Sequence, residues 1–319
     1  MGKACIGKYA KLQIDKNMKT IVISMFAFPW EIDALERVLI GLKEASFNID
    51  PNVKFTLSLT MEMSDRRVDW SKSSLPRQFF IDKLYNLKKL CNWCNYEFDI
   101  NENGCVNGAA DKKRADFAKY KDDADVFMWL DTDIYFPKHI LYTISTFVNQ
   151  IKDQYYVLTP EIIKYWDNSW DCITNKKYLG QPFNHRDFFD MFSLDTECQN
   201  MDGAYLEPIP QFKFGAGWFT CISKELFAKA TMPDFIGEYG PDDTWIMAFA
   251  QSYNAKHGRN LVNQLVMRNV VITELGKTYI VENHYKNYLN LNLIDIDAHK
   301  SKIWEVFGKE LKEHINNIL

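Results

Sequence analysis

A strand, a helix and a second strand follow one another near the start of the chain, and this order limits the folds open to it. KTIVISMFAF, residues 19–28, is a continuous apolar run of strand length, and Pro29 closes it. VKFTLSLTMEM predicts another strand at 53–61. The segment between them predicts an amphipathic helix over 31–46 through the aliphatic positions Ile32, Leu35, Leu39 and Leu42. This order is typical of an α/β fold with a mixed, mainly parallel central sheet flanked by helices.

The composition supports a globular protein with a sizeable core. Of the 319 residues, 47% are apolar and 15% aromatic. The 38 basic and 42 acidic residues give a net charge of -4, so no general affinity for polyanions is expected. No stretch approaches the roughly 20 apolar residues of a membrane span, and the N-terminus lacks an apolar signal core. We therefore expect a soluble, cytoplasmic protein without an integral membrane segment.

The seven cysteines are scattered along the chain, which favours a reducing compartment over a disulfide framework. Cys91 and Cys94 have the spacing of half a zinc knuckle, but a second CxxC or a CxxH partner is missing. Packed thiols are the favoured interpretation of this pair, with structural zinc as the alternative.

Residue patterns predict further elements. We expect helices at 77–95 and 108–120, a buried strand at 124–130, and loops with short elements over 160–212. FGAGWFTCISKELFAKA predicts a strand that passes into a helix, and DDTWIMAFAQSYNAKHG predicts a helix with an acidic start. The last segment predicts a helix with one apolar face, formed by Ile303, Trp304, Phe307, Leu311 and Ile315. We expect this face to dock on the core, and peripheral membrane contact is the alternative.

The strand at 124–130 runs directly into Asp131 and Asp133, ahead of a helix predicted to start at Pro137. Ligands of open α/β sheets gather at the carboxyl ends of strands, which is where this pair falls. In an extended segment the two carboxylates point to one side and repel each other unless a cation or donors stand between them. Oxygen ligands of this kind suit Mg²⁺ or Mn²⁺. The structural alternative is a capping role in the turn before the helix.

In this context the chain resembles the glycosyltransferases of the GT-A fold, whose D-x-D motif holds a metal on the diphosphate of a nucleotide-sugar. The resemblance covers residues 19–286 in the order of elements, and the chain looks family-2-like. The first motif of the resemblance is VFMWLDTDIYFP, which implies that Asp131 and Asp133 bind Mn²⁺ or Mg²⁺. NGAADKKRADFA, a basic helix upstream, implies that Lys112 and Arg114 contact the nucleotide; a solvated helix face is the alternative.

The third motif is FGAGWFTCISKELF, which is similar to the family's glycine-rich loop near the donor sugar and the acceptor. The resemblance implies a substrate-binding role for Gly215, Gly217 and Trp218. The two glycines permit close backbone approach, and the indole offers a flat apolar face for a sugar ring. Ordinary core packing is the alternative for the tryptophan.

The fourth motif is GEYGPDDTWIM, which looks like the family's acidic motif at a helix start. Asp242 stands where the family commonly has glutamate, and Asp243 falls at the position of the general base of inverting enzymes. Asp242 would then hold an acceptor hydroxyl, or the two roles could be exchanged, and a retaining enzyme would not need this base. The alternative is a helix start chosen for the macrodipole.

Two further positions follow from the resemblance. Many members complete the metal shell with a late histidine, and His284 in IVENHYKN is the best-placed candidate. Members often hold the nucleobase with an aspartate-rich turn after the second strand, where this chain reads LTMEMSDRR. Glu62 or Asp65 would serve there.

The resemblance therefore implies one GT-A domain over 1–319, with a tail at 1–18 and a C-terminal helix at about 291–319. A nucleotide-sugar-binding half at about 19–150 precedes an acceptor half at about 151–290. The implied activity transfers a sugar from a nucleotide-diphosphate donor, with UDP expected, to a hydroxyl of a glycan or other acceptor. A nucleic-acid acceptor and the oligomeric state stay open.

Other enzyme classes fit the sequence less well. A sugar-1-phosphate nucleotidyltransferase would carry a glycine-rich loop after the first strand, where this chain reads SMFAFPWEID. A nuclease or polymerase with two metals would need more clustered acids and a basic groove. A non-catalytic nucleotide- or carbohydrate-binding module is the alternative from a different class.

Overall fold

The structure is a computed structural model of the whole chain. It describes residues 18–64, 68–102, 108–132, 134–164, 203–209, 219–236, 242–258, 260–274, 285, 288–290 and 308–319.

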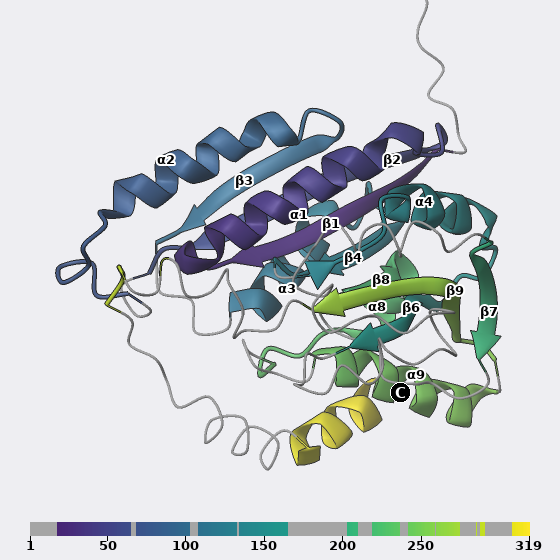
Figure 1. Cartoon of the computed structure of the whole chain (residues 1–319). Helices are drawn as coiled ribbons and strands as arrows, with labels where there is room; N and C mark the ends of the chain where they lie inside the picture. Colours follow the sequence, from purple (N-terminus) through teal and green to yellow (C-terminus); the bar gives the residue numbers. More distant parts are fainter. Residues whose placement is uncertain are drawn as a thin grey trace, which may run out of the picture.

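One mixed sheet of nine strands forms the centre of the described part of the chain (Figure 1). The strands are β1 Lys19–Ala27, β2 Val53–Glu62, β3 Asn95–Asn101, β4 Val126–Leu130, β5 Ile134–Tyr135, β6 Tyr156–Lys164, β7 Tyr205–Ile209, β8 Phe219–Ser223 and β9 Asn263–Glu274. Their order is β3-β2-β1-β4-β8-β6-β9-β5, and β7 pairs with β9. The first four strands in this order are parallel, and β8 runs antiparallel between β4 and β6. Because β6 and β9 are parallel to each other, β4, β6 and β9 all point to one edge of the sheet.

Helices cover both faces of the sheet, because alternate residues of each strand carry apolar side chains to opposite sides. The cluster that contains Ile23, Leu57 and Met128 packs under α1 Ile32–Ala45, α2 Arg77–Leu87 and α4 Ile140–Gln150. The cluster that contains Val22, Phe127 and Ile222 packs under α3 Gly108–Tyr120, α8 Lys224–Ala230 and α9 Asp242–His257. The result is a three-layer α/β/α arrangement, which confirms the predicted fold class.

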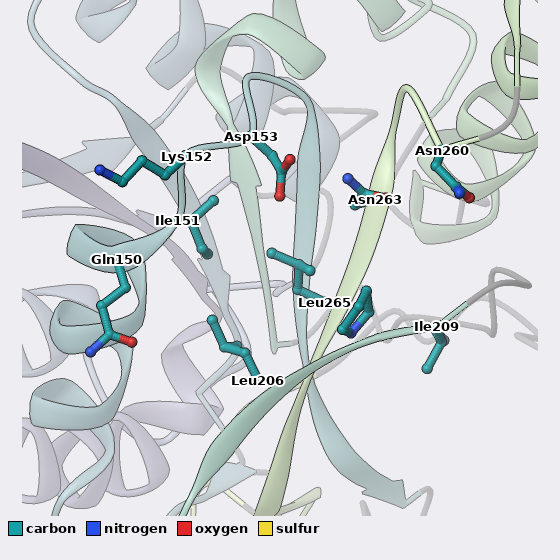
Figure 2. A pocket seen from close by; sticks show the side chains of 10 residues that line it. Gln150, Ile151, Lys152, Asp153, Leu206, Ile209, Asn260, Asn263 and Leu265 are labelled. Carbon is teal, nitrogen blue, oxygen red and sulfur yellow. The ribbon is translucent and has the colours of Figure 1, made fainter.

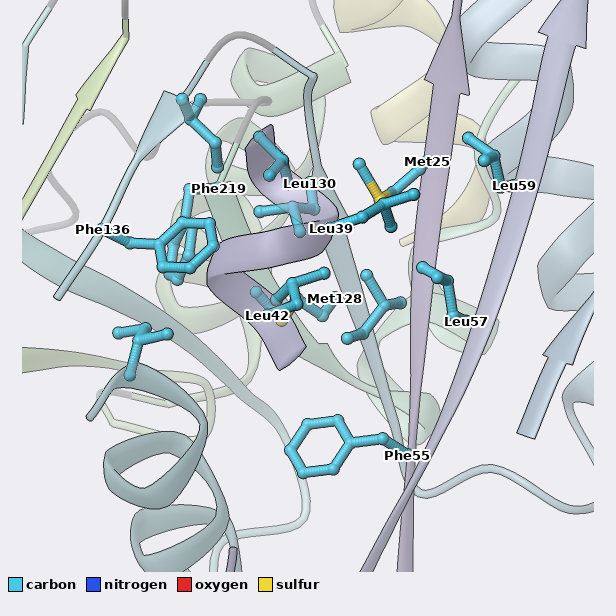
Figure 3. Close-up of a cluster of buried hydrophobic side chains, with 14 of the residues drawn as sticks. Met25, Leu39, Leu42, Phe55, Leu57, Leu59, Met128, Leu130, Phe136 and Phe219 are labelled. Atoms are coloured by element: carbon cyan, nitrogen blue, oxygen red, sulfur yellow. The ribbon is translucent and has the colours of Figure 1, made fainter. Parts of the chain in front are cut away.

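The first cluster shows why the N-terminal strand-helix-strand pattern folds as it does. Met25 of β1, Leu57 and Leu59 of β2, and Met128 of β4 project from the same face of the sheet toward Leu39 and Leu42 of α1 (Figure 3). All of these side chains are at most 1% exposed. Removal of this apolar area from water is the main stabilisation of the parallel half.

Most predicted elements of the N-terminal half match the structure. The differences lie in segments whose structure depends on pairing with distant strands. The helix predicted over 77–95 is shorter in the structure: α2 ends at Leu87, a 3-10 turn continues to Leu90, and the strand β3, which was not predicted, starts at Asn95 beside β2. The helix predicted from Pro137 begins at Ile140, after the short strand β5. The loops and short elements predicted over 160–212 include the end of β6 and the short strand β7.

The predicted elements of the C-terminal half also have counterparts. β8 and α8 form the predicted strand and helix, and α9 begins on its two aspartates. Residues 308–318 are helical, and Leu311 and Ile315 are buried in the second cluster, which confirms core docking for them. Ile303, Trp304 and Phe307 lie outside the described residues. No helix in the described ranges is long and apolar enough to cross a bilayer.

Candidate functional site

The D-x-D segment begins at the carboxyl end of β4, next to the carboxyl end of β1. Asp131 is half-buried there, and Asp133 lies outside the described residues. Between them, the buried Thr132 donates from Oγ1 to Oε2 of Glu31 over 3.1 Å. The same Glu31 oxygen accepts the backbone N–H of Phe28 at 3.0 Å, in the turn that follows β1. The segment is therefore tied to the neighbouring strand end by hydrogen bonds to a carboxylate.

Lys113 connects this strand end to the acidic start of α9. Its Nζ lies 4.2 Å from the centroid of the Trp129 ring, two residues before Asp131, and forms an ion pair with Oδ2 of Asp242. The Lys113 and Asp242 side chains are 8% and 16% exposed. Water therefore screens this ion pair only weakly. The side chain of one lysine thus spans the distance between the D-x-D strand and the acidic helix start.

The two predicted acids occupy the first turn of α9. Asp242 accepts from Lys113, whereas Oδ1 of Asp243 accepts the N–H of Thr244 at 2.6 Å. A 16-residue helix presents unpaired N–H groups and a positive partial charge at this end, which favours carboxylates there. Both acids therefore have a structural reason to sit at this helix start, in addition to the catalytic role that the sequence predicts.

The predicted nucleotide ligands Lys112 and Arg114 lie on α3 and have partners within the protein. Nζ of Lys112 contacts Oγ of Ser58 at 2.5 Å and Oδ1 of Asp116 at 2.6 Å. Arg114 donates to the carbonyl oxygens of residues 233 and 236 at 2.8 and 3.0 Å. Their binding to a nucleotide stays a prediction, and it would require these side chains to exchange or share their present partners.

Glu62 is placed at the end of β2, as the sequence predicts, but its carboxylate is 1% exposed. Oε1 accepts the N–H of Ser64 at 2.7 Å, and Oε2 accepts from Nδ2 of Asn101 at 2.9 Å. These bonds join the carboxyl ends of β2 and β3. A nucleobase-binding role for Glu62 stays a prediction; Asp65 lies outside the described residues.

Several predicted ligands cannot be compared with the structure. Gly215, Gly217, Trp218 and His284, like Asp133, lie outside the described residues. Within the ranges that are described, no three His, Cys, Asp or Glu side chains gather as a metal site. Asp131 is the described member of the predicted metal ligands.

The cysteine pair of the sequence contains free thiols. Cys91 is buried and Cys94 half-buried, and burial raises the pKa of each to about 12. Zinc binding requires thiolates, and burial of this kind disfavours them. Packing is therefore the better account of the pair.

A hollow lies at the opposite edge of the sheet. Its volume is about 600 Å³, and its lining includes Ile151 and Asp153 after α4, Ile209 at the end of β7, and Asn263 at the start of β9 (Figure 2). Because β4 and β9 point the same way, this hollow lies at their amino edge, away from Asp131. Open α/β sheets bind ligands at the carboxyl edge, so this hollow is not the candidate site.

Lys113 is the site residue that sequence analysis missed. It stands between two predicted ligands in the run Lys112 to Arg114, and nothing local distinguishes it. Its ionic partner is 129 residues away in the sequence. Only the packing of α3 against β4 and α9 reveals it.

Comparisons with known proteins return only distant likenesses. No protein-family model matches the chain. No curated protein matches it either. Among solved structures, the chain is similar to S. aureus TarS 1-349 in complex with UDP-GlcNAc, with 12% identity, coverage of 90% of this chain and 70% of that chain, and a TM-score of 0.44. It is also similar to the mannosyltransferase PcManGT from Pyrobaculum calidifontis in complex with GDP-Man and Mn²⁺, with 13% identity, coverage of 85% and 59%, and a TM-score of 0.46. These values describe a distant likeness of overall arrangement and assign no ligand or activity to this chain.

Proposed function

We propose that the protein is a metal-dependent glycosyltransferase that moves a sugar from a nucleotide-diphosphate donor to an acceptor hydroxyl. The observation that carries the proposal is the position of Lys113, between Trp129 on the D-x-D strand and Asp242 at the start of α9. This contact supports a site in which both acidic motifs, more than 100 residues apart in the sequence, take part at the carboxyl edge of the sheet. This is the edge at which open α/β sheets bind ligands.

Asp131, Asp133 and His284 are the residues that would hold Mn²⁺ or Mg²⁺. Of these three residues the structure describes Asp131. It fits the role, because it is a half-buried carboxylate at the carboxyl edge of the sheet and offers a hard oxygen ligand. A bound divalent cation would supply charge stabilisation to the diphosphate leaving group.

Asp243 is the proposed general base, which takes the proton of the acceptor hydroxyl in an inverting transfer. Asp242 is less suited to this task, because its carboxylate is already bound by the Lys113 ammonium. Asp242 instead fixes the first turn of α9 and thereby the position of its neighbour. Gly215, Gly217 and Trp218 are proposed to contact the donor sugar and the acceptor.

The expected donor is a UDP-sugar, and the expected acceptor is a glycan or another hydroxyl compound. The net charge of -4 gives no general field for an acidic polymer. Lys112, Arg114 and Glu62 are proposed as nucleotide contacts, after rearrangement of the internal bonds described above.

The first test is calorimetric binding of UDP and of GDP to metal-stripped protein, with and without Mn²⁺. We expect one nucleotide to bind only when Mn²⁺ is present. Asp133→Ala should abolish this binding, whereas Asp123→Asn, in an exposed turn of another Asp-x-Asp pair, should leave it unchanged. Absence of binding to either nucleotide by the folded protein would overturn the proposal.

A second variant separates an enzyme from a binding module. Asp243→Asn should retain nucleotide binding and lose sugar transfer, because the base acts on the acceptor and not on the donor. Loss of a single general base costs about 10²- to 10⁴-fold in rate. Unchanged transfer by Asp243→Asn would exclude this residue as the base.

A further inference from the structure

The three consecutive basic residues of α3 reach three different parts of the protein. Lys112 contacts Ser58 on β2, Lys113 contacts Asp242 on α9, and Arg114 contacts the backbone of the turn before α9. These partners belong to both halves of the sequence. Helix α3 is therefore a physical link between the parallel strands β1, β2 and β4 and the acidic start of α9.

Polar contacts orient α3 on the sheet together with the partly buried ring of Phe117, which packs on Phe127 and Phe227. The buried positions of the helix are Gly108, Ala110, Lys113 and Asp116, which carry small or charged side chains. Apolar area alone specifies the position of such a face poorly, because it is small and not directional. Charged hydrogen bonds depend on direction and distance, so they contribute to the orientation of this helix in addition to the aromatic contacts of Phe117.

The strands beneath α3 present a row of side chains that suits these contacts. Ser58, Ser24, Trp129 and Thr220 are successive partners in register across β2, β1, β4 and β8, so they lie on one face. Lys112 and Asp116 bond to the first of them, and Lys113 lies over the third. The Lys113 ammonium is thus fixed from below by an indole ring before it meets α9.

The ion pair of Lys113 with Asp242 is sensitive to the loss of either member. Both side chains are largely removed from water. Loss of one charge would leave the other buried without its counter-ion, and a buried charge moves or becomes solvated to avoid this state. In either case the first turn of α9, which contains Asp243, would change position.

We infer that Lys113 is a positioning residue, which sets the place of Asp243 by holding Asp242 and Trp129 together. This inference rests on the proposed function, in which Asp243 is the general base. In this inference Lys113 acts through Asp242 and does not bind the donor. Its removal should therefore lower the turnover number and leave nucleotide affinity unchanged.

The experiment is a double-mutant cycle with Lys113→Met, Asp242→Asn and the combined variant in the full chain. Lys119→Met is the matched control, because Lys119 is on the same helix but pairs with Glu97 at the exposed surface. Three quantities are measured for each protein: the free energy of unfolding in urea, the affinity for UDP or GDP with Mn²⁺, and kcat for sugar transfer.

We expect Lys113→Met to lower kcat about 100-fold, as a catalytic group displaced by about 1 Å does, with unchanged nucleotide affinity. The loss should be much smaller in the Asp242→Asn background, because the contact is already broken there. Lys119→Met should behave as the wild type. Additive losses of kcat in the double variant would overturn the inference. Weaker nucleotide binding by Lys113→Met would also overturn it, because Lys113 would then be a donor ligand.

The unfolding measurements separate this inference from the proposed function. Coupling between Lys113 and Asp242 in the free energy of unfolding, without transfer by the wild type, would support the link between α3 and α9 and contradict the glycosyltransferase. Transfer by the wild type and equal transfer by Lys113→Met would support the enzyme and contradict the positioning role. Should Lys113→Met fail to fold, Asp242→Asn tests the same contact from the other side and should show the same loss of kcat.

Discussion

The residues of the candidate site are held by hydrogen bonds to charged groups, and this determines how single substitutions should act. Thr132 shows it most simply, since it stands between the two aspartates of the D-x-D motif. Its buried hydroxyl bonds to Glu31, and Glu31 also accepts the N–H of Phe28. The hydroxyl of the middle residue therefore fixes the motif to the turn after β1.

Substitution Thr132→Val should destabilise the protein. Valine keeps the shape of threonine but cannot donate to the Glu31 carboxylate. We expect a loss of about 1–3 kcal/mol in the free energy of unfolding, measured with urea. Thr132→Ser retains the hydroxyl and should recover most of this loss. A Thr132→Val protein as stable as the wild type would contradict the importance of this bond.

At the scale of elements, an aromatic cluster joins the helices of the second face to the D-x-D strand. The ring centroid of Phe227 on α8 lies 4.5 Å from that of Phe117 on α3 and 5.8 Å from that of Trp245 on α9. Its distances to the ring centroids of Phe127 and Trp129 on β4 are 5.5 Å and 6.0 Å. Phe227 is 2% exposed. An apolar side chain outside the candidate site thus contacts rings on α3, β4 and α9.

Truncation of this ring should have a large effect on stability. Phe227→Ala leaves a cavity among three helices and one strand, and we expect a loss of about 3–5 kcal/mol in the free energy of unfolding. Phe47→Ala is the control, because that ring is 81% exposed and its removal should change stability by about 0.5 kcal/mol or less. Equal effects of the two substitutions would contradict the packing described here.

At the scale of the whole molecule, a single sheet passes through both halves of the sequence. The pairing of β4 with β8 joins the parallel strands to the mixed ones. β1 is paired on both sides and buried along most of its length, whereas β3 is the end of the strand order and is largely exposed. Protection from solvent should therefore fall from the centre of the sheet to this edge.

Amide hydrogen exchange tests this order. Amides of β1 and β4 should exchange only through the largest openings of the molecule, and those of β3 should exchange faster by local opening. The readout is exchange of peptic fragments followed by mass spectrometry under native conditions. Protection of β3 equal to that of β1 would show that another surface covers this edge.

Elements whose signals are local could be predicted from the sequence. The apolar run of β1, the heptad-like spacing of α1 and the acidic start of α9 each predict their element, because burial and capping act on neighbouring residues. The same locality identified Asp131 at a strand end and Asp242 at a helix start. These patterns were sufficient for the α/β class and for two parts of the site.

Features that depend on distant partners became visible only in the folded chain. The strand β3 was not predicted from the sequence, because its hydrogen-bond partners lie on β2, and Lys113 is indistinguishable from Lys112 until α9 packs beside it. Strand pairing and ion pairs join residues far apart in the chain, so no window of sequence contains both members. The sequence therefore supplied the acids of the proposed site, and the fold supplied the lysine that brings them together.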